Sequence, residues 1–394
     1  MSTAVHPALE RPRVLMLLDN VNEESGGAER FAIGLAAALP AQRCDVWVCT
    51  TRVARGPLIA ALGEAGVRHL HLGRRPGRLD PLAFRPLART LRGQRIDVLH
   101  AHMFGSNVWG TLIGRLCQVP VVVANETTWS YEGQPLRRAL DGQLIGRFAD
   151  AFVAVSEADR ARMVGLEGVP STKTVVIPTA YLPRPRAAAA ADVRAELGLG
   201  AEDSVIGTIA ILRPQKALHV LVDAFAQVVR SLPRAHLVIA GPSPGPVRGE
   251  LEEQAVALGL EDRVHLLGQR DDVEEVWRAF DVGAISSDFE GTPLAAIECL
   301  TCGVPLVATA VGGLPDIIEH DSTGVLVAPG DAAALATALE DLLRDPDRRA
   351  RLGAAGRERA RAFTIERIAA RFAQLYRQLL AAPDGGAMPS AGRP

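Results

Sequence analysis

Lysine is almost absent from this chain. Lys173 and Lys216 are the two lysines among 43 basic residues, and every other cation is an arginine. The 394 residues also contain no apolar run near the ~20 residues that a membrane-spanning helix needs. The first residues carry no apolar segment typical of a secretion signal, so we expect a cytoplasmic protein. A net charge of −2 does not favour nucleic acid as a partner.

Cysteine is sparse as well. The five cysteines are scattered and odd in number, which favours buried, reduced thiols over a disulfide framework or a zinc site. Asp345 and Asp347 form a D-x-D string, but arginines surround it, so we interpret it as a surface turn and not as a metal clamp. We therefore expect no metal and no resident cofactor.

The first half of the chain alternates apolar strand-like runs with helix-like segments. These runs cover residues 13–19, 44–51, 96–102, 119–125 and 150–156. Strands that alternate with helices predict a parallel sheet covered on both faces. The length of the chain fits two domains of roughly 150–200 residues each.

The alternation stops near Pro183, where prolines and an alanine run suggest a linker, and then begins again. The second set of strand-like runs covers residues 204–212, 236–241, 263–268, 281–287, 304–310 and 323–329. We predict an α/β protein of two Rossmann-like, doubly wound lobes that face a cleft, with domains at 1–182 and 192–363. Residues 364–380 show apolar positions at helical spacing, and 383–394 resemble a disordered tail.

The sequence FEGTPLAAIECL contains two carboxylates, Glu290 and Glu298, which suggest either an acid/base pair or a clamp. Thr292 followed by Pro293 predicts a helix start, with threonine as the cap and proline at the first helical position. A helix N-terminus binds anions, and Glu298 lies on the same face as Leu294, within reach of ligand hydroxyls. This arrangement favours a clamp for a sugar nucleotide over a capping loop with a solvated glutamate.

A second candidate is the sequence ILRPQKAL, which follows a predicted strand. It contains Arg213 and Lys216, and their two charges together could neutralise a diphosphate. The alternative is a pair of solvated surface charges.

Two glycine pairs follow predicted strands and permit a ligand to approach the backbone closely. Gly26 and Gly27 precede a helix in the first lobe, without the spacing of a dinucleotide-binding motif, and Gly312 and Gly313 lie in the second lobe. Ordinary turns are the competing explanation for both pairs.

Polar side chains end the strands of the first lobe. His100, His102, Asn125, Glu126 and Thr127 all stand at or just past predicted carboxyl ends, the edge at which open α/β sheets bind ligands. We expect His102 and Glu126 to orient hydroxyls of the substrates. Ordinary hydrogen-bonded residues remain the alternative.

Together the sequences GGAER, AVSEADR, ILRPQKAL, FEGTPLAAIE and CGVPLVATAVGGLPDII resemble the retaining glycosyltransferases of the GT-B fold, in glycosyltransferase group 1 and family 4. The resemblance extends over nearly the whole chain. It implies a hexosyltransferase-class enzyme that uses a nucleotide sugar as co-substrate, with uridine as the expected base. It also implies that helix 364–381 returns to the first lobe, which would bind the acceptor.

The resemblance assigns roles to the candidate residues. Arg213 and Lys216 would hold the diphosphate and stabilise the leaving group. Glu298 would hold the ribose, and Glu290 the donor sugar. The remaining donor contacts would come from Leu267, Gln269 and Arg270 at the base, from Gly291, Thr292, Pro293 and Leu294, and from the glycines 26, 27, 312 and 313. Asn125 and Thr127 would lie on the acceptor side.

The chain departs from the family pattern in two places. Many relatives carry a histidine just past the strand that ends at Asn125, where this chain has Glu126 and Thr127. Many also carry Asn-Gly where Thr179 and Ala180 stand here. The donor-sugar contact and the acceptor geometry could therefore differ.

Other functions stay open from the sequence. A nucleotide-sugar epimerase, a phosphorylase of similar fold and a non-catalytic nucleotide-sugar binder are the alternatives. The acceptor could be a cell-envelope glycan, a lipid-linked sugar or a small molecule. Basic residues outnumber acidic ones in residues 1–180, and residues 81–95 carry an apolar row among arginines that suggests peripheral membrane contact. The alternative for this row is a helix that packs on the first sheet.

Overall fold

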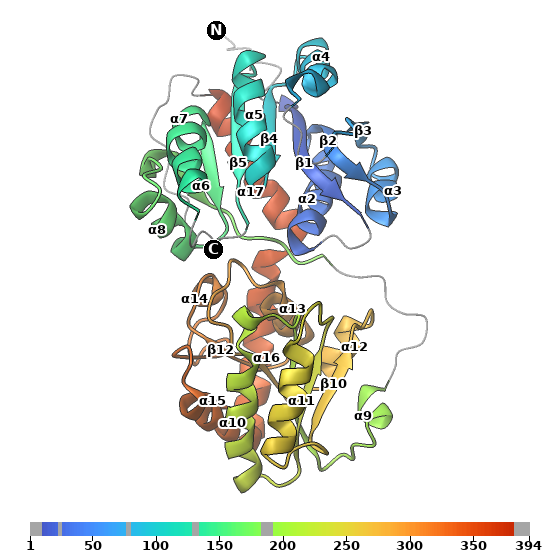
Figure 1. Ribbon diagram of the computed structural model, residues 1–394, viewed down its shortest axis with the longest axis vertical. Helices are drawn as coiled ribbons and strands as arrows, with labels where there is room; N and C mark the ends of the chain where they lie inside the picture. Colours follow the sequence, from blue (N-terminus) through green and yellow to red (C-terminus); the bar gives the residue numbers. More distant parts are fainter. Residues whose placement is uncertain (1–9, 23–25, 76–79, 128–133, 183–191, 382–394) are drawn as a thin grey trace. The chain divides into compact units, whose positions relative to one another are not determined.

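The computed structural model describes residues 10–22, 26–75, 80–127, 134–182 and 192–381. The chain divides into two compact units (Figure 1). Unit 1 contains residues 1–182 and 364–394, and unit 2 contains residues 183–363. The tail expected at 383–394 lies outside the described residues.

Unit 1 is built on a sheet of parallel strands in the order β3-β2-β1-β4-β5-β6-β7. The strands are β1 (Arg13–Val21), β2 (Asp45–Ala54), β3 (Arg68–His71), β4 (Val98–His102), β5 (Val121–Asn125), β6 (Ala151–Ala154) and β7 (Thr174–Val176). Strands β4, β5 and β6 are buried along their whole length, as expected for a sheet covered on both faces. The strand order reverses between β1 and β4.

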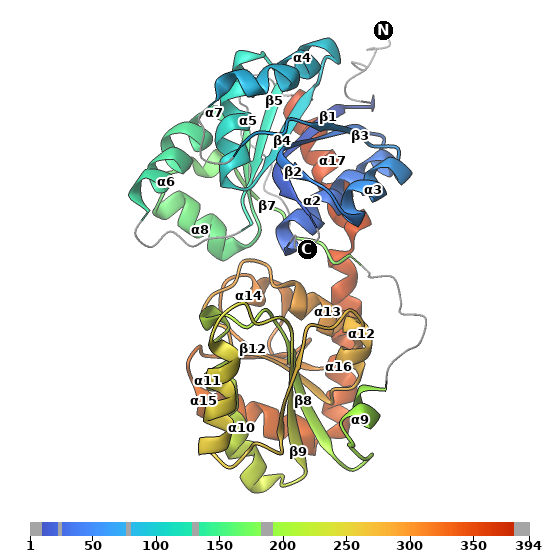
Figure 2. The same ribbon diagram turned by 45° about the vertical axis from the view of Figure 1, so that its right-hand side comes forward.

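Helices cover both faces of this sheet (Figure 2). Helices α2 (Gly27–Ala38) and α17 (Ile365–Ala381) pack on one face, and α4 (Arg85–Gly93) and α5 (Phe104–Leu116) pack on the other. The remaining helices of unit 1 are α3 (Pro57–Glu64), α6 (Pro135–Leu140), α7 (Gly146–Phe148) and α8 (Glu157–Gly165).

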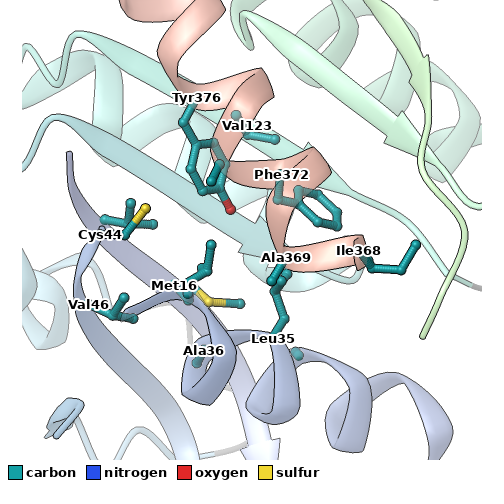
Figure 3. Packing of buried hydrophobic residues seen from close by; sticks show 14 of the residues in the cluster. Met16, Leu35, Ala36, Cys44, Val46, Val123, Ile368, Ala369, Phe372 and Tyr376 are labelled. Carbon is teal, nitrogen blue, oxygen red and sulfur yellow. The ribbon is translucent and has the colours of Figure 1, made fainter. Parts of the chain in front are cut away.

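Helix α17 follows unit 2 in the chain but belongs to the core of unit 1. Its Ile368, Phe372 and Tyr376 are fully buried against α2 and the sheet (Figure 3). The hydroxyl of Tyr376 lies 2.7 Å from Nδ1 of His100 on β4. An apolar stripe at helical spacing therefore completes a core whose other half was formed near the start of the chain.

Unit 2 has a second parallel sheet, in the order β10-β9-β8-β11-β12-β13. Its strands are β8 (Ser204–Ile209), β9 (Ala235–Ala240), β10 (Val264–Gly268), β11 (Val282–Ile285), β12 (Leu306–Thr309) and β13 (Val325–Val327). The order reverses between β8 and β11. The connection after β8 therefore leads toward β9 on one side, and the connection after β11 leads toward β12 on the other.

The helices of unit 2 also lie on both faces of their sheet. Helices α10 (Leu218–Ser231), α11 (Val247–Ala257) and α15 (Ala332–Arg344) share one core, and α12 (Val273–Arg278) and α13 (Leu294–Cys302) pack on the opposite face (Figure 2). Gly283 of β11 allows this close packing, because a Cβ there would lie 2.5 Å from Sγ of Cys299 and 3.2 Å from the Trp277 ring. The remaining helices are α9 (Val193–Glu196), α14 (Leu314–Ile317) and α16 (Pro346–Ala360).

The architecture of two doubly wound lobes is confirmed. The apolar row in residues 81–95 follows the alternative of a helix that packs on the first sheet, because Phe84, Leu87 and Leu91 are buried in that core and Leu82 alone of the four is exposed. Asp345 lies exposed between α15 and α16, in the surface turn that the sequence predicted, and its side chain also caps α16 by accepting a hydrogen bond from the backbone N–H of Arg348. Within the described ranges, no helix is long and apolar enough to cross a membrane.

Candidate functional site

The candidate site of unit 2 lies where its strand order reverses, between β8 and β11. Open α/β sheets bind ligands outside the carboxyl ends of their strands at such a point. The loop after β8 contains Arg213 and Lys216, and the loop after β11 contains Glu290. Residues 77 positions apart in the chain are thereby brought to one edge, as the sequence predicted for these side chains.

An ion pair joins the two loops. Nζ of Lys216 lies 2.6 Å from Oε1 of Glu290, and the two side chains are 20% and 8% exposed. The hydroxyl of Ser287 donates a second hydrogen bond, of 2.7 Å, to the same oxygen. The Glu290 carboxylate is therefore held in one position by two donors, one of them charged.

Backbone contacts fix the same two loops. The N–H of Asp288 donates to the carbonyl of Gln215, and the hydroxyl of Ser286 donates to the carbonyl of Lys216, both over 2.9 Å. Ala217 has φ +44°, an uncommon conformation for a residue with a Cβ, and it leads directly into α10. Backbone strain of this kind is found at sites where function requires a fixed geometry. Ser286 and Ser287 were not among the predicted site residues, although two polar residues directly after a buried strand are typical of a ligand-binding sheet edge.

Helix α13 begins one residue later than predicted. Pro293 is its N-cap, in extended conformation and without a side-chain hydrogen bond, so Thr292 is not the cap and Pro293 is not the first helical residue. The physical reason is that proline favours an extended position here as well as a helical first turn. Leu294 and Ala295 therefore supply the N–H groups of the first turn that no intrahelical carbonyl accepts. Glu298 follows one turn later and is partly exposed.

A second loop packs on the first through glycine. Gly312 has φ +52°, and a Cβ on it would lie 1.7 Å from the carbonyl oxygen of Glu290. The N–H of Gly313 donates to the carbonyl of Gly291 over 2.7 Å. These two glycines thus support the loop that carries Glu290, which is a more specific role than an ordinary turn.

The other predicted donor residues of unit 2 differ in their exposure and in their ion pairs. Arg213 is exposed, and no side-chain contact to it is found in the described residues. Arg270 donates to both oxygens of Asp272 and is also paired with Glu196, and these contacts raise the pKa of its guanidinium. Its guanidinium is therefore fixed between two carboxylates, next to the strand end where the base was predicted. Leu267 is partly buried at the end of β10, and Gln269 is exposed.

In unit 1, His102 and Asn125 lie at adjacent carboxyl ends of β4 and β5 and are buried. Burial lowers the pKa of His102 to about 3, so the ring is neutral at physiological pH. In the part of the chain that the structure describes, neither ring nitrogen of His102 has a hydrogen-bond partner, nor does the side-chain amide of Asn125. Asn107 on α5 holds the Asn125 backbone through two hydrogen bonds.

Glu126 is buried and engaged. One of its oxygens lies 3.4 Å from a nitrogen of Arg137, and the other accepts from the N–H of Thr127. Glu167 lies close by, and burial together with repulsion from Asp141 and Glu126 raises its pKa to about 8. The Glu126 carboxylate is therefore almost fully buried in an ion pair, and its predicted catalytic role stays a prediction.

The glycines at the start of α2 are placed as predicted. Gly26 is the N-cap of this helix, with extended backbone, and Gly27 is its first residue. Gly26 offers no side chain to cap the helix, so the first N–H groups of α2 have no acceptor within the helix or its N-cap side chain.

The cysteines are buried or half-buried, as expected, and they form no disulfide. Cys299 and Cys302 do stand in C-x-x-C spacing on α13, although burial raises the pKa of both thiols, that of Cys302 to about 12. Thiols with such pKa values are poor nucleophiles and metal ligands. Across the described residues, no group of three or more His, Cys, Asp or Glu side chains is placed to hold a metal ion.

Comparisons with known proteins agree with this architecture. The profile of the family described as Glycosyl transferases group 1 matches residues 190–359, and that of Glycosyltransferase Family 4 matches residues 25–181. The D-inositol 3-phosphate glycosyltransferase of Xylanimonas cellulosilytica is 31% identical, covering 94% of this chain and 98% of its own. The protein of the same name from Kineococcus radiotolerans is 29% identical over 90% of this chain and 91% of its own.

Solved structures show the same fold. Anabaena Alr3699/HepE, crystallised in complex with UDP, superimposes with a TM-score of 0.78 at 26% identity, covering 92% of this chain and 99% of that one. Sucrose-phosphate synthase from Thermosynechococcus elongatus has a TM-score of 0.73 at 24% identity, covering 94% and 100%. The present chain belongs to the glycosyltransferases of group 1 and family 4, which have the GT-B fold, and it is a glycosyltransferase.

Proposed function

We propose that this enzyme transfers a sugar from a uridine diphosphate sugar to an acceptor hydroxyl, with retention of configuration and without a metal ion. Unit 2 binds the donor, and unit 1 binds the acceptor. The observation that carries the donor assignment is the Lys216–Glu290 pair, 2.6 Å long, at the point where the strand order of unit 2 reverses. The crystallisation of Alr3699/HepE with UDP supports uridine as the base.

The geometry of the unit 2 loops supports the donor contacts that we propose. Arg213 and Lys216 bind the diphosphate, and the N–H groups of Leu294 and Ala295 add the anion site of a helix N-terminus. Glu290, fixed by Lys216 and Ser287, accepts hydrogen bonds from hydroxyls of the transferred sugar. Glu298 accepts those of the ribose, and the base lies near Leu267 at the end of β10.

The chemical step needs a stabilised leaving group more than a protein nucleophile. The bond between the anomeric carbon and the β-phosphate oxygen breaks, and the acceptor oxygen bonds to the same carbon on the same face. The acceptor proton moves to the departing phosphate oxygen. Negative charge grows on the diphosphate as the bond breaks, so Arg213, Lys216 and the start of α13 lower the barrier electrostatically.

The acceptor is a hydroxylated molecule, and the small-molecule class is favoured over an envelope glycan. The relatives named for D-inositol 3-phosphate support a small acceptor. Burial of the apolar row of α4 removes the feature that suggested a membrane-bound one. We place the reaction in the cytoplasm.

A panel of UDP-, GDP-, ADP- and dTDP-sugars tests the donor assignment through melting shifts and nucleotide release. The uridine compounds should raise the melting temperature of the wild type, and Lys216→Met should lose most of that shift. Arg344→Met is a matched control, since it removes a cation from an exposed ion pair on the last turn of α15. Binding of none of the four nucleotides, or equal binding by Lys216→Met and wild type, would overturn the proposal. Full activity after treatment with a chelator is expected, and loss of activity would contradict metal independence.

A further inference from the structure

Arg74 in unit 1 is a buried arginine held by aromatic rings. It lies three residues past the end of β3, and its backbone N–H donates to the carbonyl of Thr51 over 2.8 Å. The carbon at the centre of its guanidinium lies 4.2 Å from the Phe84 ring centroid and 5.5 Å from that of Trp109. The guanidinium is thus within cation–π distance of both rings, and the residue is 7% exposed. Its N–H edge is the part left for other contacts.

That edge is unused within the described residues. Nε and Nη1 of Arg74 are both buried without a hydrogen-bond partner. A guanidinium does not release its proton at physiological pH, so burying these donors unpaired costs free energy. Proteins tolerate such a cost where a ligand supplies the missing acceptors.

A second arginine lies nearby with the same property. Arg52 in β2 also has a buried Nε without a partner in the described ranges. Burial lowers the pKa of Arg74, and the charge of Arg52 lowers it further, against the opposite effect of Asp19 and Asp80. The carboxylates of Asp19 and Asp80 act on Arg74 through their charge, but Asp19 accepts a hydrogen bond from the hydroxyl of Thr51, and Asp80 accepts from two backbone N–H groups of its own turn. Neither fills Nε or Nη1 of Arg74. Two like charges with unfilled donors are therefore left side by side at the carboxyl edge of the unit 1 sheet.

Space for a small anion adjoins Arg74. A cavity of about 220 Å³ is lined by Gly73, Arg74, Arg75, Asp80 and Ala83. This volume admits a phosphate-sized group but is small for a complete ligand. The fork of an arginine matches the oxygens of a phosphate, and stacking keeps the fork in place before the ligand arrives.

We propose that Arg74, assisted by Arg52, binds a phosphate monoester carried by the acceptor. This inference rests on the proposed function for the identity of the acceptor, but not for the anion site itself. Because the sheet edge around Arg74 belongs to unit 1, phosphate recognition by these arginines is independent of the diphosphate contacts that Arg213 and Lys216 make in unit 2. The acceptor would then be chosen by its charge as well as by its hydroxyl.

The test measures binding of inorganic phosphate to the full chain by titration calorimetry, with excess UDP present to occupy the diphosphate site. Arg74→Met keeps much of the apolar contact with Phe84 and removes the donors, so phosphate affinity should fall roughly tenfold or more. Arg74→Lys keeps the positive charge without the forked donors of arginine, so its phosphate affinity should lie between those of wild type and Arg74→Met. Arg68→Met is the matched control, because Arg68 also stacks on a ring, that of Trp47, but is exposed. The phosphate affinity of Arg68→Met should equal that of wild type.

The readouts separate this inference from the proposed function. Removal of an unpaired buried charge should leave the melting temperature of Arg74→Met equal to or above that of wild type, whereas a purely structural arginine would lower it. UDP binding should be unchanged in this variant. Equal phosphate affinity in wild type and Arg74→Met, or no phosphate binding by the wild type, would overturn the inference even if UDP binds. Failure of UDP to bind would overturn the donor assignment, and the phosphate affinities of wild type and Arg74→Met would still decide whether Arg74 binds phosphate.

Discussion

Replacement of Gly312 by alanine tests whether two loops of unit 2 are held together by close backbone packing. The new Cβ would lie 1.7 Å from the carbonyl oxygen of Glu290, and real Cβ atoms essentially never approach within 3.0 Å. The loops must therefore move apart by more than ~1 Å, which strains the hydrogen bond from Gly313 to Gly291. The positive φ of +52° adds a penalty of its own.

A matched variant separates the cost of the positive φ from the cost of the clash in the unfolding free energy of Gly312→Ala. Gly330 has φ +74° with nothing within 4 Å of a new Cβ, so Gly330→Ala reports the conformational penalty alone, about 1 kcal/mol. Gly312→Ala should cost about 2–4 kcal/mol of unfolding free energy, because the clash and the weakened hydrogen bond add to the same penalty. Urea unfolding of both variants at one pH measures the difference.

Ligand binding gives the second half of this test. Displacement of the Glu290 backbone should reduce UDP-sugar affinity at least tenfold in Gly312→Ala and leave it unchanged in Gly330→Ala. Equal unfolding free energies for the two variants, together with wild-type affinity in both, would refute the packing argument.

Two further predictions concern unit 1. The carboxyl of Glu167 titrates near ~4.3 when unfolded but at about 8 in the fold. The stability that it contributes is present below the unfolded value and is lost as pH rises through 8. Glu167→Gln should therefore raise the unfolding free energy at pH 8–9 by on the order of 1–3 kcal/mol and change it little at pH 4; equal gains at both pH values in urea unfolding would contradict this. Tyr376→Phe removes the hydroxyl that lies 2.7 Å from Nδ1 of the buried His100 ring, and it should cost about 1–3 kcal/mol in the same assay without altering UDP binding. An unchanged unfolding midpoint would show that this hydrogen bond carries no net stability.

Much of the architecture follows from the sequence because buried parallel strands are continuous apolar runs. The run RVLMLLD identifies β1, and SVIGTI identifies β8, without any tertiary information. Strand β3 was not predicted, because its sequence RHLH is short, polar and at the sheet edge. Helix α16 was also missed, since its many charged residues obscure the apolar positions that face the core.

The site was predictable in its members but not in its contacts. The loops that carry Lys216 and Glu290 each follow a strand, so their common edge could be inferred from the fold class. Their direct pairing depends on the order of strands in the sheet, which no local pattern contains. The capping error at Thr292 has a similar origin, because Thr-Pro fits both a cap with a first turn and an extended entry.

Buried polar groups were the least predictable part. His102 and Asn125 were correctly expected at strand ends, but their burial depends on tertiary packing, such as the contact of the His102 ring with Phe31 of α2, a residue 71 positions earlier in the chain. Arg74 gave no signal at all among 43 basic residues, since its role depends on rings contributed by Phe84 and Trp109.

The central claim is that Lys216 and Glu290 form a clamp for a nucleoside diphosphate sugar. Titration calorimetry of UDP-glucose into wild type, Lys216→Met, Glu290→Gln and the double variant tests it most directly. We predict that each single change weakens binding at least tenfold, and that the double change costs less than the sum of both because the two residues are coupled at 2.6 Å. Wild-type affinity in both single variants, or an exact sum of independent effects in the double variant, would contradict the account.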